Sequence, residues 1–433
     1  MKNEMVVRPT FQERVIHREV GHLSLWMLPM PVEDVVTIQG SFYTYPDFSK
    51  GEELLQELTV QLLDKGTERH DKFELADLLE SRGAEISFFS EELRVGFSCR
   101  MLRQDVADVI ALLAEQLRMP RFDERELELA RAQLAAGIQR SMESTAAQAA
   151  GALSRRLYPL DHPNYVEEPQ HLLQRLGTYT ADDVRAYYRH HFGAQNLLVV
   201  AVGDFEEEVL EDACKQHLAD WEPHTSSPNF AKKAIYEAPG RTTIAMPDRV
   251  NVDVRIGHGL PLRRTDKEFL PLYVGNFILG GNFSARLMSI VRDEMGLTYG
   301  IGSALVGIMP EYEGHWQVAV TLSQELLERG IEATMRVVEQ FVEEGATAEE
   351  LADKKTTITG NFEVGLASTG GLAAALLAAL ERGLGVEYLD RFPQEVQTLS
   401  LEEVNAAIRK YLHPNHAHVA IAGLPVSNSD ARS

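Results

Sequence analysis

Two stretches of the chain carry the same pattern and decide the fold. The first, from Thr180 to Gly203, reads TADDVRAYYRHHFGAQNLLVVAVG, and the second, from Ser400 to Gly423, reads SLEEVNAAIRKYLHPNHAHVAIAG. The two align without a gap. In each, a Thr or Ser followed by two acidic residues predicts a helix start, because the hydroxyl caps free amides and carboxylates favour that end of the helix dipole. A polar break and an apolar run ending in Gly then predict a strand, so the chain contains an internal duplication.

The similarity continues upstream as matched pairs of elements. Apolar or alternating runs predict strands at Asp34–Gly40 and Asp253–Gly259, and each leads through a polar loop to an apolar helix. The further pairs, in chain order, are Glu52–Leu63 with Lys267–Leu279, Lys72–Ser81 with Ser284–Glu294, Leu93–Arg100 with His315–Leu322, Asp105–Leu117 with Glu325–Glu344, and Phe122–Arg140 with Thr347–Gly365.

The two copies meet at a segment that reads as a linker. Pro, Ser and Thr cluster in Asp220–Lys233 (DWEPHTSSPNFAKK), and the periodicity disappears there. We therefore expect two homologous half-domains, residues 1–222 and 223–433. Strands occur in groups rather than in strict alternation with helices, which predicts an α+β fold with a mixed or antiparallel sheet packed with helices in each half. Such a pair can enclose a cavity between its halves or between two chains.

Composition narrows the functions to be considered. The chain has 65 acidic and 42 basic residues and a formal net charge of −23, which disfavours nucleic-acid binding. The N-terminus lacks the pattern of a signal peptide and no apolar run approaches the length of a membrane span, so we expect no membrane role. Cys99 and Cys214 form no metal or redox motif, and a reducing cytoplasm is the expected location.

Two segments resemble the insulinase-like zinc peptidases, the family of pitrilysin and the mitochondrial processing peptidase. KGEELLQELTVQLLDKGT, Lys50–Thr67, is similar to the region where the family carries H-x-x-E-H shortly before a K-G-T turn. LGGNFSARLMSIVRDEMGLTYGIGS, Leu279–Ser303, is similar to its C-terminal segment, in which an Arg and a Tyr act on the peptide. The resemblance assigns these substrate-binding roles to Arg292 and Tyr299. The alternative is that Arg292 pairs with an acidic neighbour and Tyr299 is a core residue of a strand.

The metal ligands that the family uses are missing. Counted back from the K-G-T turn, the three motif positions are Glu57, Val60 and Gln61, and the downstream glutamate position is Gly137. A catalytic zinc needs three protein ligands and an open position for water, and only Glu57 could still ligate. We therefore expect no cofactor on this chain and no peptide hydrolysis by the chain alone.

Other candidate residues have simpler interpretations. His413, His416 and His418 have spacing that metal sites also use, but polar loop residues are the preferred interpretation. His190 and His191 suit the C-terminal end of a helix, where a cationic imidazole favours the dipole. His70 is expected to be solvated in a charged loop. The Gly280–Gly281 pair either lets a loop approach substrate or simply forms a turn.

The resemblance implies a division of labour between two chains. A homologous partner would hold zinc on its H-x-x-E-H motif, and this chain would contribute Arg292, Tyr299 and part of a shared cavity to a heterodimeric peptidase. The peptide would lie as an added strand along a sheet edge, with Ala84–Phe89 as the candidate edge. The alternatives are a non-enzymatic scaffold or peptide-binding protein of the same fold, and an independently active homodimer, for which no metal site is found.

Overall fold

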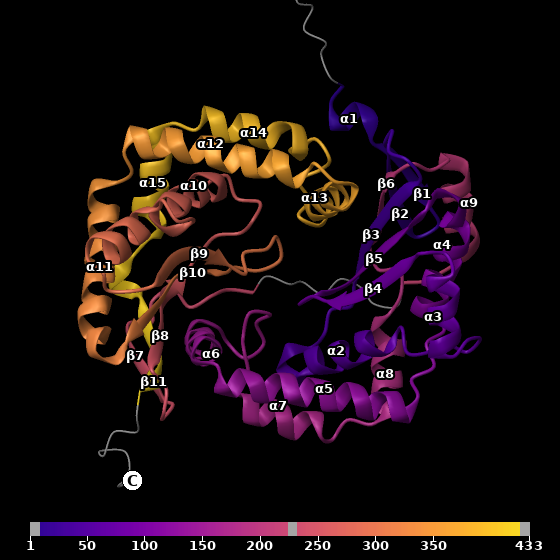
Figure 1. The fold of residues 1–433 in the computed structure, drawn as a ribbon, viewed down its shortest axis with the longest axis horizontal. Coiled ribbons are helices and arrows are strands. Elements are labelled where there is room, and N and C mark those ends of the chain that lie inside the picture. The colour runs from indigo at the N-terminus through magenta and orange to yellow at the C-terminus, as the bar shows by residue number, and fades with distance from the viewer. Residues whose placement is uncertain (1–8, 224–231, 425–433) are drawn as a thin grey trace, which may run out of the picture. The chain divides into compact units, whose positions relative to one another are not determined.

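The computed structural model describes residues 9–223 and 232–424 (Figure 1). Most of the predicted linker, Asp220–Lys233, lies outside these residues. The chain forms two compact units, which do not follow the two halves of the sequence. Unit 1 comprises Met1–Gln133, Leu176–Pro228 and Asn361–Gln394, and unit 2 comprises Leu134–Arg175, Asn229–Gly360 and Glu395–Ser433. The proposed limits 1–222 and 223–433 stay a prediction about the repeat.

Unit 1 is built on a sheet with the strand order β1-β2-β6-β3-β5-β4. Only the β2–β6 pair is parallel, and the other pairs are antiparallel. The strands are β1 Ile16–Val20, β2 Leu23–Pro29, β3 Val35–Tyr43, β4 Glu85–Ser90, β5 Arg94–Leu102 and β6 Leu197–Gly203. Its helices are α1 Phe11–Arg14, α2 Glu52–Leu62, α3 Lys72–Glu80, α4 Val106–Arg118, α8 Ala181–His191, α9 Glu207–His217 and α13 Thr369–Glu381.

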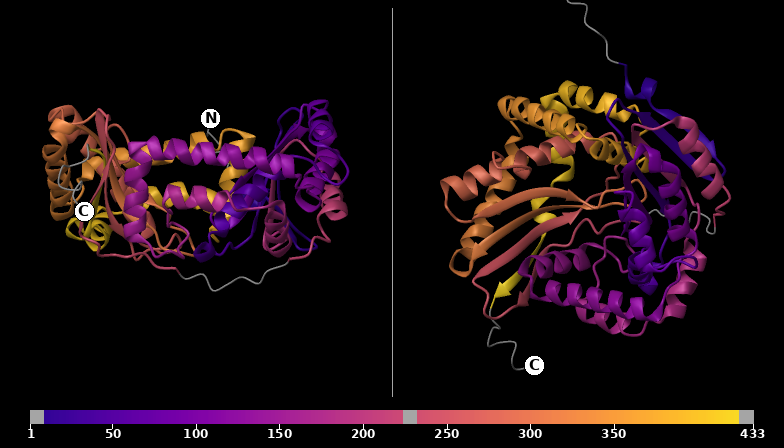
Figure 2. Two further views of the ribbon diagram at one scale, coloured as in Figure 1. Left: turned by 90° about the horizontal axis from the view of Figure 1, so that it is seen from below. Right: turned by 45° about the vertical axis from the view of Figure 1, so that its right-hand side comes forward.

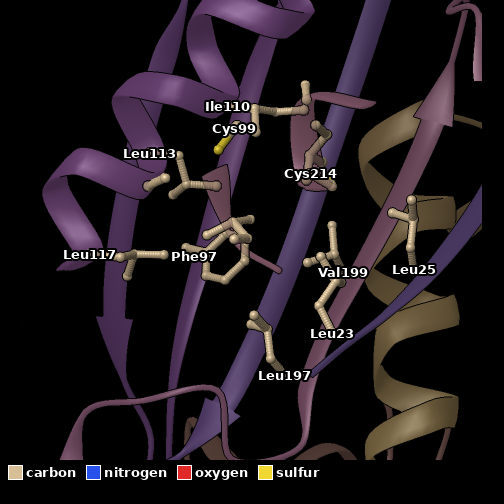
Figure 3. Packing of buried hydrophobic residues seen from close by; sticks show 14 of the residues in the cluster. Leu23, Leu25, Phe97, Cys99, Ile110, Leu113, Leu117, Leu197, Val199 and Cys214 are labelled. Atoms are coloured by element: carbon tan, nitrogen blue, oxygen red, sulfur yellow. The ribbon is translucent and has the colours of Figure 1, made fainter. Parts of the chain in front are cut away.

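Both faces of this sheet bury apolar side chains at its centre. On one face, residues from α4 and α9 pack on the strands in a core that includes the unpaired Cys99 and Cys214 (Figure 3). On the other face, α13 covers β6, whose Leu198, Val200 and Val202 form a second core with it. A strand buried on both sides explains why LLVVAVG reads as a continuous apolar run rather than an alternating one.

Unit 2 repeats the arrangement with the strand order β7-β11-β8-β10-β9. Its strands are β7 Gly240–Ala245, β8 Asn251–Gly259, β9 Gly300–Val306, β10 His315–Ser323 and β11 His418–Leu424. They lie side by side in the right-hand view of Figure 2. Its helices are α6 Thr145–Leu157, α7 Pro169–Leu176, α10 Phe269–Gly280, a π-helical segment Met288–Glu294, α11 Leu327–Glu344 and α15 Leu401–Tyr411. As in unit 1, one pair, β7–β11, is parallel. The predicted α+β class and the duplication are confirmed.

The two copies of the repeat, Thr180–Gly203 and Ser400–Gly423, have matching local structure. Thr180 caps the start of α8 and Ser400 caps the start of α15, each in a capping box. The hydroxyl of the cap accepts from the amide of the residue three positions later, and the carboxylate of that residue accepts from the amide of the cap. These bonds lower the pKa of both carboxyls, chiefly through the hydroxyls of the caps. Strands β6 and β11 then take equivalent places in the two sheets.

Each sheet is covered by a helix from the other half of the sequence. α6 packs on β8 and β11, and α13 packs on β3 and β6. Both helices are anchored at their first turn: Thr145 Oγ1 donates to Asp253 Oδ2 at 2.6 Å, and Thr369 Oγ1 lies 3.0 Å from Thr37 Oγ1. Boundaries between the units fall within α5 Glu124–Glu143, α12 Ala348–Gly365 and α14 Tyr388–Thr398, and at the last residue of α7. Neither half of the sequence alone therefore contains all the elements of one unit.

Among the helices of the described ranges, none has by itself the length and apolarity needed to cross a membrane. Only α12 and α13 taken together meet that test, across a bend of 113°.

Candidate functional site

The three positions of the degenerate metal motif lie on α2 and do not fit a zinc ion. Gln61 Nε2 donates a hydrogen bond to Glu57 Oε1 at 2.9 Å, so the one carboxylate of the motif that could bind a metal is already bonded to an amide. Val60 is buried in the core of unit 1. In residues 9–223 and 232–424, no group of three His, Cys, Asp or Glu side chains could hold a metal.

The fourth position is also without a donor atom. Gly137 lies within α5, and a Cβ placed there would meet only the tip of Arg140, at 3.9 Å. A side chain is therefore sterically tolerated at Gly137. Hydrolysis through a metal held at these positions has no support in the side chains of this chain.

Gln56, which no sequence pattern singled out, connects α2 to the sheet through hydrogen bonds. Gln56 is 1% exposed, and its Oε1 accepts from the hydroxyls of Thr44 and Tyr187. Its Nε2 donates to Ser90 Oγ at 2.9 Å and to the Glu91 carbonyl, at the turn between β4 and β5. The available signal was a polar residue on the otherwise apolar face of the predicted helix.

The candidate peptide-binding edge is indeed a sheet edge. β4, which contains most of the predicted Ala84–Phe89 segment, is the last strand of the unit 1 sheet. Its side chains alternate between exposed and half-buried positions. An edge strand presents backbone amides and carbonyls that an added strand can pair with.

Arg292 and Tyr299 lie in unit 2, on either side of the turn between the π-helical segment and β9. Arg292 Nε is 4.0 Å from Asp293 Oδ1, a loose contact, and its guanidinium carbon is 5.8 Å from the ring centre of Phe283. Tyr299 is 93% exposed. The alternative that Tyr299 is a strand core residue is wrong, because its ring lies in solvent at the start of an edge strand.

The glycine turn before this segment is held rigidly. Lys354 is 4% exposed, and its Nζ donates to Asn282 Oδ1 at 2.9 Å and to the carbonyl and hydroxyl of Ser284 at 2.9 and 2.7 Å. Burial lowers the pKa of Lys354. Between the two anchored residues, Phe283 is 78% exposed. The turn thus presents an aromatic ring next to Arg292.

The histidines have structural partners. His413 Nε2 contacts the Lys410 carbonyl and His416 lies 3.6 Å from Glu237, both in the segment before β11. His418 is 3% exposed, lies in β11 and contacts Ala238 and Thr242, so the interpretation of it as a polar loop residue is wrong. His190 and His191 end α8 as expected.

The interpretation of His70 as a solvated loop residue is wrong. Its Nδ1 lies 2.8 Å from Oε1 of the buried Glu115, which also accepts from the hydroxyl of Thr67. The tertiary structure brings that carboxylate to the loop from α4, where it lines a hollow of about 540 Å³ with His70.

Comparison with known proteins gives the chain its relatives. The family model described as Insulinase (Peptidase family M16) matches residues 58–163, and the one described as Peptidase M16 inactive domain matches residues 178–358. A protein of Helicobacter pylori named non-peptidase homolog YmxG is 22% identical over 85% of this chain and 84% of its own length. An uncharacterized zinc protease of Streptomyces coelicolor is 22% identical over 72% of this chain and 68% of its own length.

Solved structures share the fold. A peptidase M16 inactive domain from Pseudomonas fluorescens superposes with a TM-score of 0.84 at 22% identity, covering 95% of this chain and 99% of that one. A protease from Helicobacter pylori gives a TM-score of 0.83 at 15% identity, covering 94% and 100%. With two models of one family matching successive parts of a duplicated α+β chain, the protein belongs to the peptidase M16 (insulinase) family.

Proposed function

We propose that this chain is the non-catalytic, substrate-binding subunit of a two-chain zinc metallopeptidase. A homologous partner carries H-x-x-E-H and the zinc ion, and this chain contributes Arg292 and Tyr299 to the site. The observation that carries the proposal is the contrast between two parts of the chain. The motif positions on α2 are filled by a Glu57–Gln61 hydrogen bond, whereas the Arg–Tyr pair is kept at the surface.

The exposure of Tyr299 supports a role in binding. A phenol ring that is 93% exposed adds nothing to the apolar core and leaves its hydroxyl available to a ligand. Among the described residues, the only ion pair of Arg292 is the loose contact with Asp293, so its guanidinium can still donate. A guanidinium and a phenol together suit a peptide carbonyl on which negative charge develops.

The edge strand β4 supports an extended mode of peptide binding. Its outer backbone groups can pair with the main chain of any peptide, with little dependence on the peptide's sequence. The name non-peptidase homolog, given to the relative from Helicobacter pylori, also supports an inactive chain. We place the complex in the cytoplasm, since a reducing compartment suits the buried unpaired Cys99 and Cys214.

The experiment measures zinc content and the turnover of a quenched fluorescent peptide. The purified chain is assayed alone and mixed with an H-x-x-E-H homologue from the same organism. We expect no stoichiometric zinc and no turnover alone, and activity in the mixture that falls about 100-fold with Arg292→Ala and clearly with Tyr299→Phe. Arg121→Ala, which removes an exposed arginine paired only loosely with Asp123, serves as the matched control.

Two results would contradict the proposal. Turnover with bound zinc by the chain alone would favour an independent peptidase. Full activity of the Arg292→Ala mixture would favour a scaffold or simple peptide-binding protein of the same fold.

A further inference from the structure

The face of the unit 1 sheet that carries α13 is divided into an apolar and a polar half. On β6 it presents Leu198, Val200 and Val202, which form one core with residues of α13. The boundary runs along β3, where Thr37 contacts Thr369 at one end of α13 and Ser41 donates to Glu381 at the other, at 2.5 Å. Beyond β3, the C-terminal end of α13 still accepts a hydrogen bond from Arg94 of β5, at 3.4 Å to the Glu381 carbonyl, whereas beside the start of α13 the face becomes polar.

Strand register aligns the polar residues in two rows. Thr37 of β3 pairs with Arg100 of β5, which pairs with Glu85 of β4. The next row has Ser98 of β5 at its centre, between Gln39 on β3 and Ser87 on β4. An antiparallel sheet can leave part of a face to solvent, and such a part carries polar side chains, so these two rows mark an open surface that a polar ligand can reach.

These rows form the floor of a hollow of about 370 Å³. The start of α13, Ser368–Gly370, lines its side. Arg100 is the one cation in the lining and is exposed, and within the described residues it makes no ion pair. On the corresponding face of unit 2, by contrast, Arg255 is already neutralised by Asp253 at 3.8 Å.

The electrostatics of the hollow favour an anionic group. Arg100 and the amide end of α13 are both electropositive, and the flanking Thr and Ser hydroxyls can donate hydrogen bonds. The opposing charge is Glu85, which lies on the edge strand β4 in the same floor row, directly opposite Arg100. Apart from Glu85, the lining offers hydroxyl, amide and guanidinium donors.

We infer that this hollow is a subsite for a carboxylate of an extended peptide, either an Asp or Glu side chain or the C-terminal carboxylate. The inference rests on the proposed function, because it requires peptide binding at β4. A peptide paired with β4 lies about 4.8 Å from that strand and turns every second side chain to the face of Glu85 and Ser87. A long acidic side chain on that face lies within reach of Arg100.

The test measures the affinity of labelled eight-residue peptides for the purified full chain by fluorescence polarisation. One peptide has Glu at alternate positions and a C-terminal amide, its partner has Gln instead, and a third has the Gln sequence with a free C-terminal carboxylate. We expect one or both carboxylate peptides to bind about tenfold more tightly than the Gln amide, and Arg100→Gln to abolish the difference. Arg121→Gln should leave it unchanged, and circular dichroism checks that both variants fold.

Each outcome decides the inference. A preference for the Glu peptide assigns the subsite to acidic side chains, and a preference for the free carboxylate assigns it to the peptide terminus. Three results would overturn the inference while leaving peptide binding intact. All three peptides could bind equally, a peptide with Lys in place of Glu could bind more tightly, or the preference for a carboxylate could survive Arg100→Gln. Loss of the Arg292 effect in the two-chain assay, with the carboxylate preference retained, would instead overturn only the catalytic part of the proposed function.

Discussion

Replacing Gln56 by Leu should destabilise unit 1 much more than the same change at Gln61, five positions further along the helix. Gln56 is completely enclosed, and its side chain makes hydrogen bonds with five other residues, from the hydroxyl of Tyr187 at 3.1 Å to the turn after β4. Gln61 is half-buried and makes one hydrogen bond, to Glu57. The two substitutions have the same chemistry, so their difference isolates the buried network.

The magnitude follows from the groups left without partners. Leucine would leave the Tyr187 hydroxyl and the Glu91 carbonyl unsatisfied in the interior, at about 1–3 kcal/mol each. The hydroxyl of Thr44 keeps a longer bond of 3.4 Å to the Leu93 carbonyl, which reduces its loss. The added apolar burial of Leu offsets about 1 kcal/mol. We expect a net loss of about 2–4 kcal/mol for Gln56→Leu, and about 1 kcal/mol or less for Gln61→Leu.

The assay is urea unfolding followed by the fluorescence of Trp26 and Trp221, both in unit 1, with hydrogen exchange measured across the β4–β5 turn. Gln56→Leu should lower the unfolding midpoint and speed exchange in that turn, because the helix no longer holds it. Equal free energies of unfolding for the two variants, or unchanged exchange at the turn, would refute the reasoning that Gln56 connects α2 to the edge strand.

Three further predictions concern other parts of the chain. Lys354→Met should lower the free energy of unfolding of unit 2 by about 2–4 kcal/mol in urea denaturation, because it leaves the Asn282 and Ser284 oxygens without their buried donor. Acid should destabilise unit 2, because burial lowers the pKa of three of its histidines to about 4, and the unfolded chain therefore binds more protons than the folded chain between pH 6.5 and 4. The free energy of unfolding, at its full value above pH 6.5, should fall by about 2 kcal/mol per histidine at pH 5. Unfolding followed by Trp316 fluorescence at pH 7.5 and pH 5 checks this, and equal stability at the two pH values would contradict it. These histidines are His162, His258 and His315. Chelation with EDTA should leave the melting temperature unchanged in scanning calorimetry, since the α2 positions hold no ligand set; a drop would reveal a bound metal.

The helices, strands and repeat were predictable from short-range patterns. The capping boxes at Thr180 and Ser400 and the apolar strands after them are local signals, and the structure has both. The loss of metal ligands was readable too, since motif spacing along one helix places Glu57 and Gln61 on one side of it. The contact of the half-buried His70 with the buried Glu115 could not be predicted, because the partner lies 45 residues away along the chain.

By itself, the sequence determined the α+β duplication, the places of the degenerate motif and the positions of Arg292 and Tyr299, because periodicity, caps and motif spacing act within a few residues. Only the tertiary structure decided that α6 and α13 each cover the sheet of the other half, and that the polar rows around Arg100 are left open beside α13. The physical reason is that these contacts join residues that lie far apart in the sequence. Side-chain anchors between distant residues, Thr145 with Asp253 and Thr369 with Thr37, form only once the chain has folded.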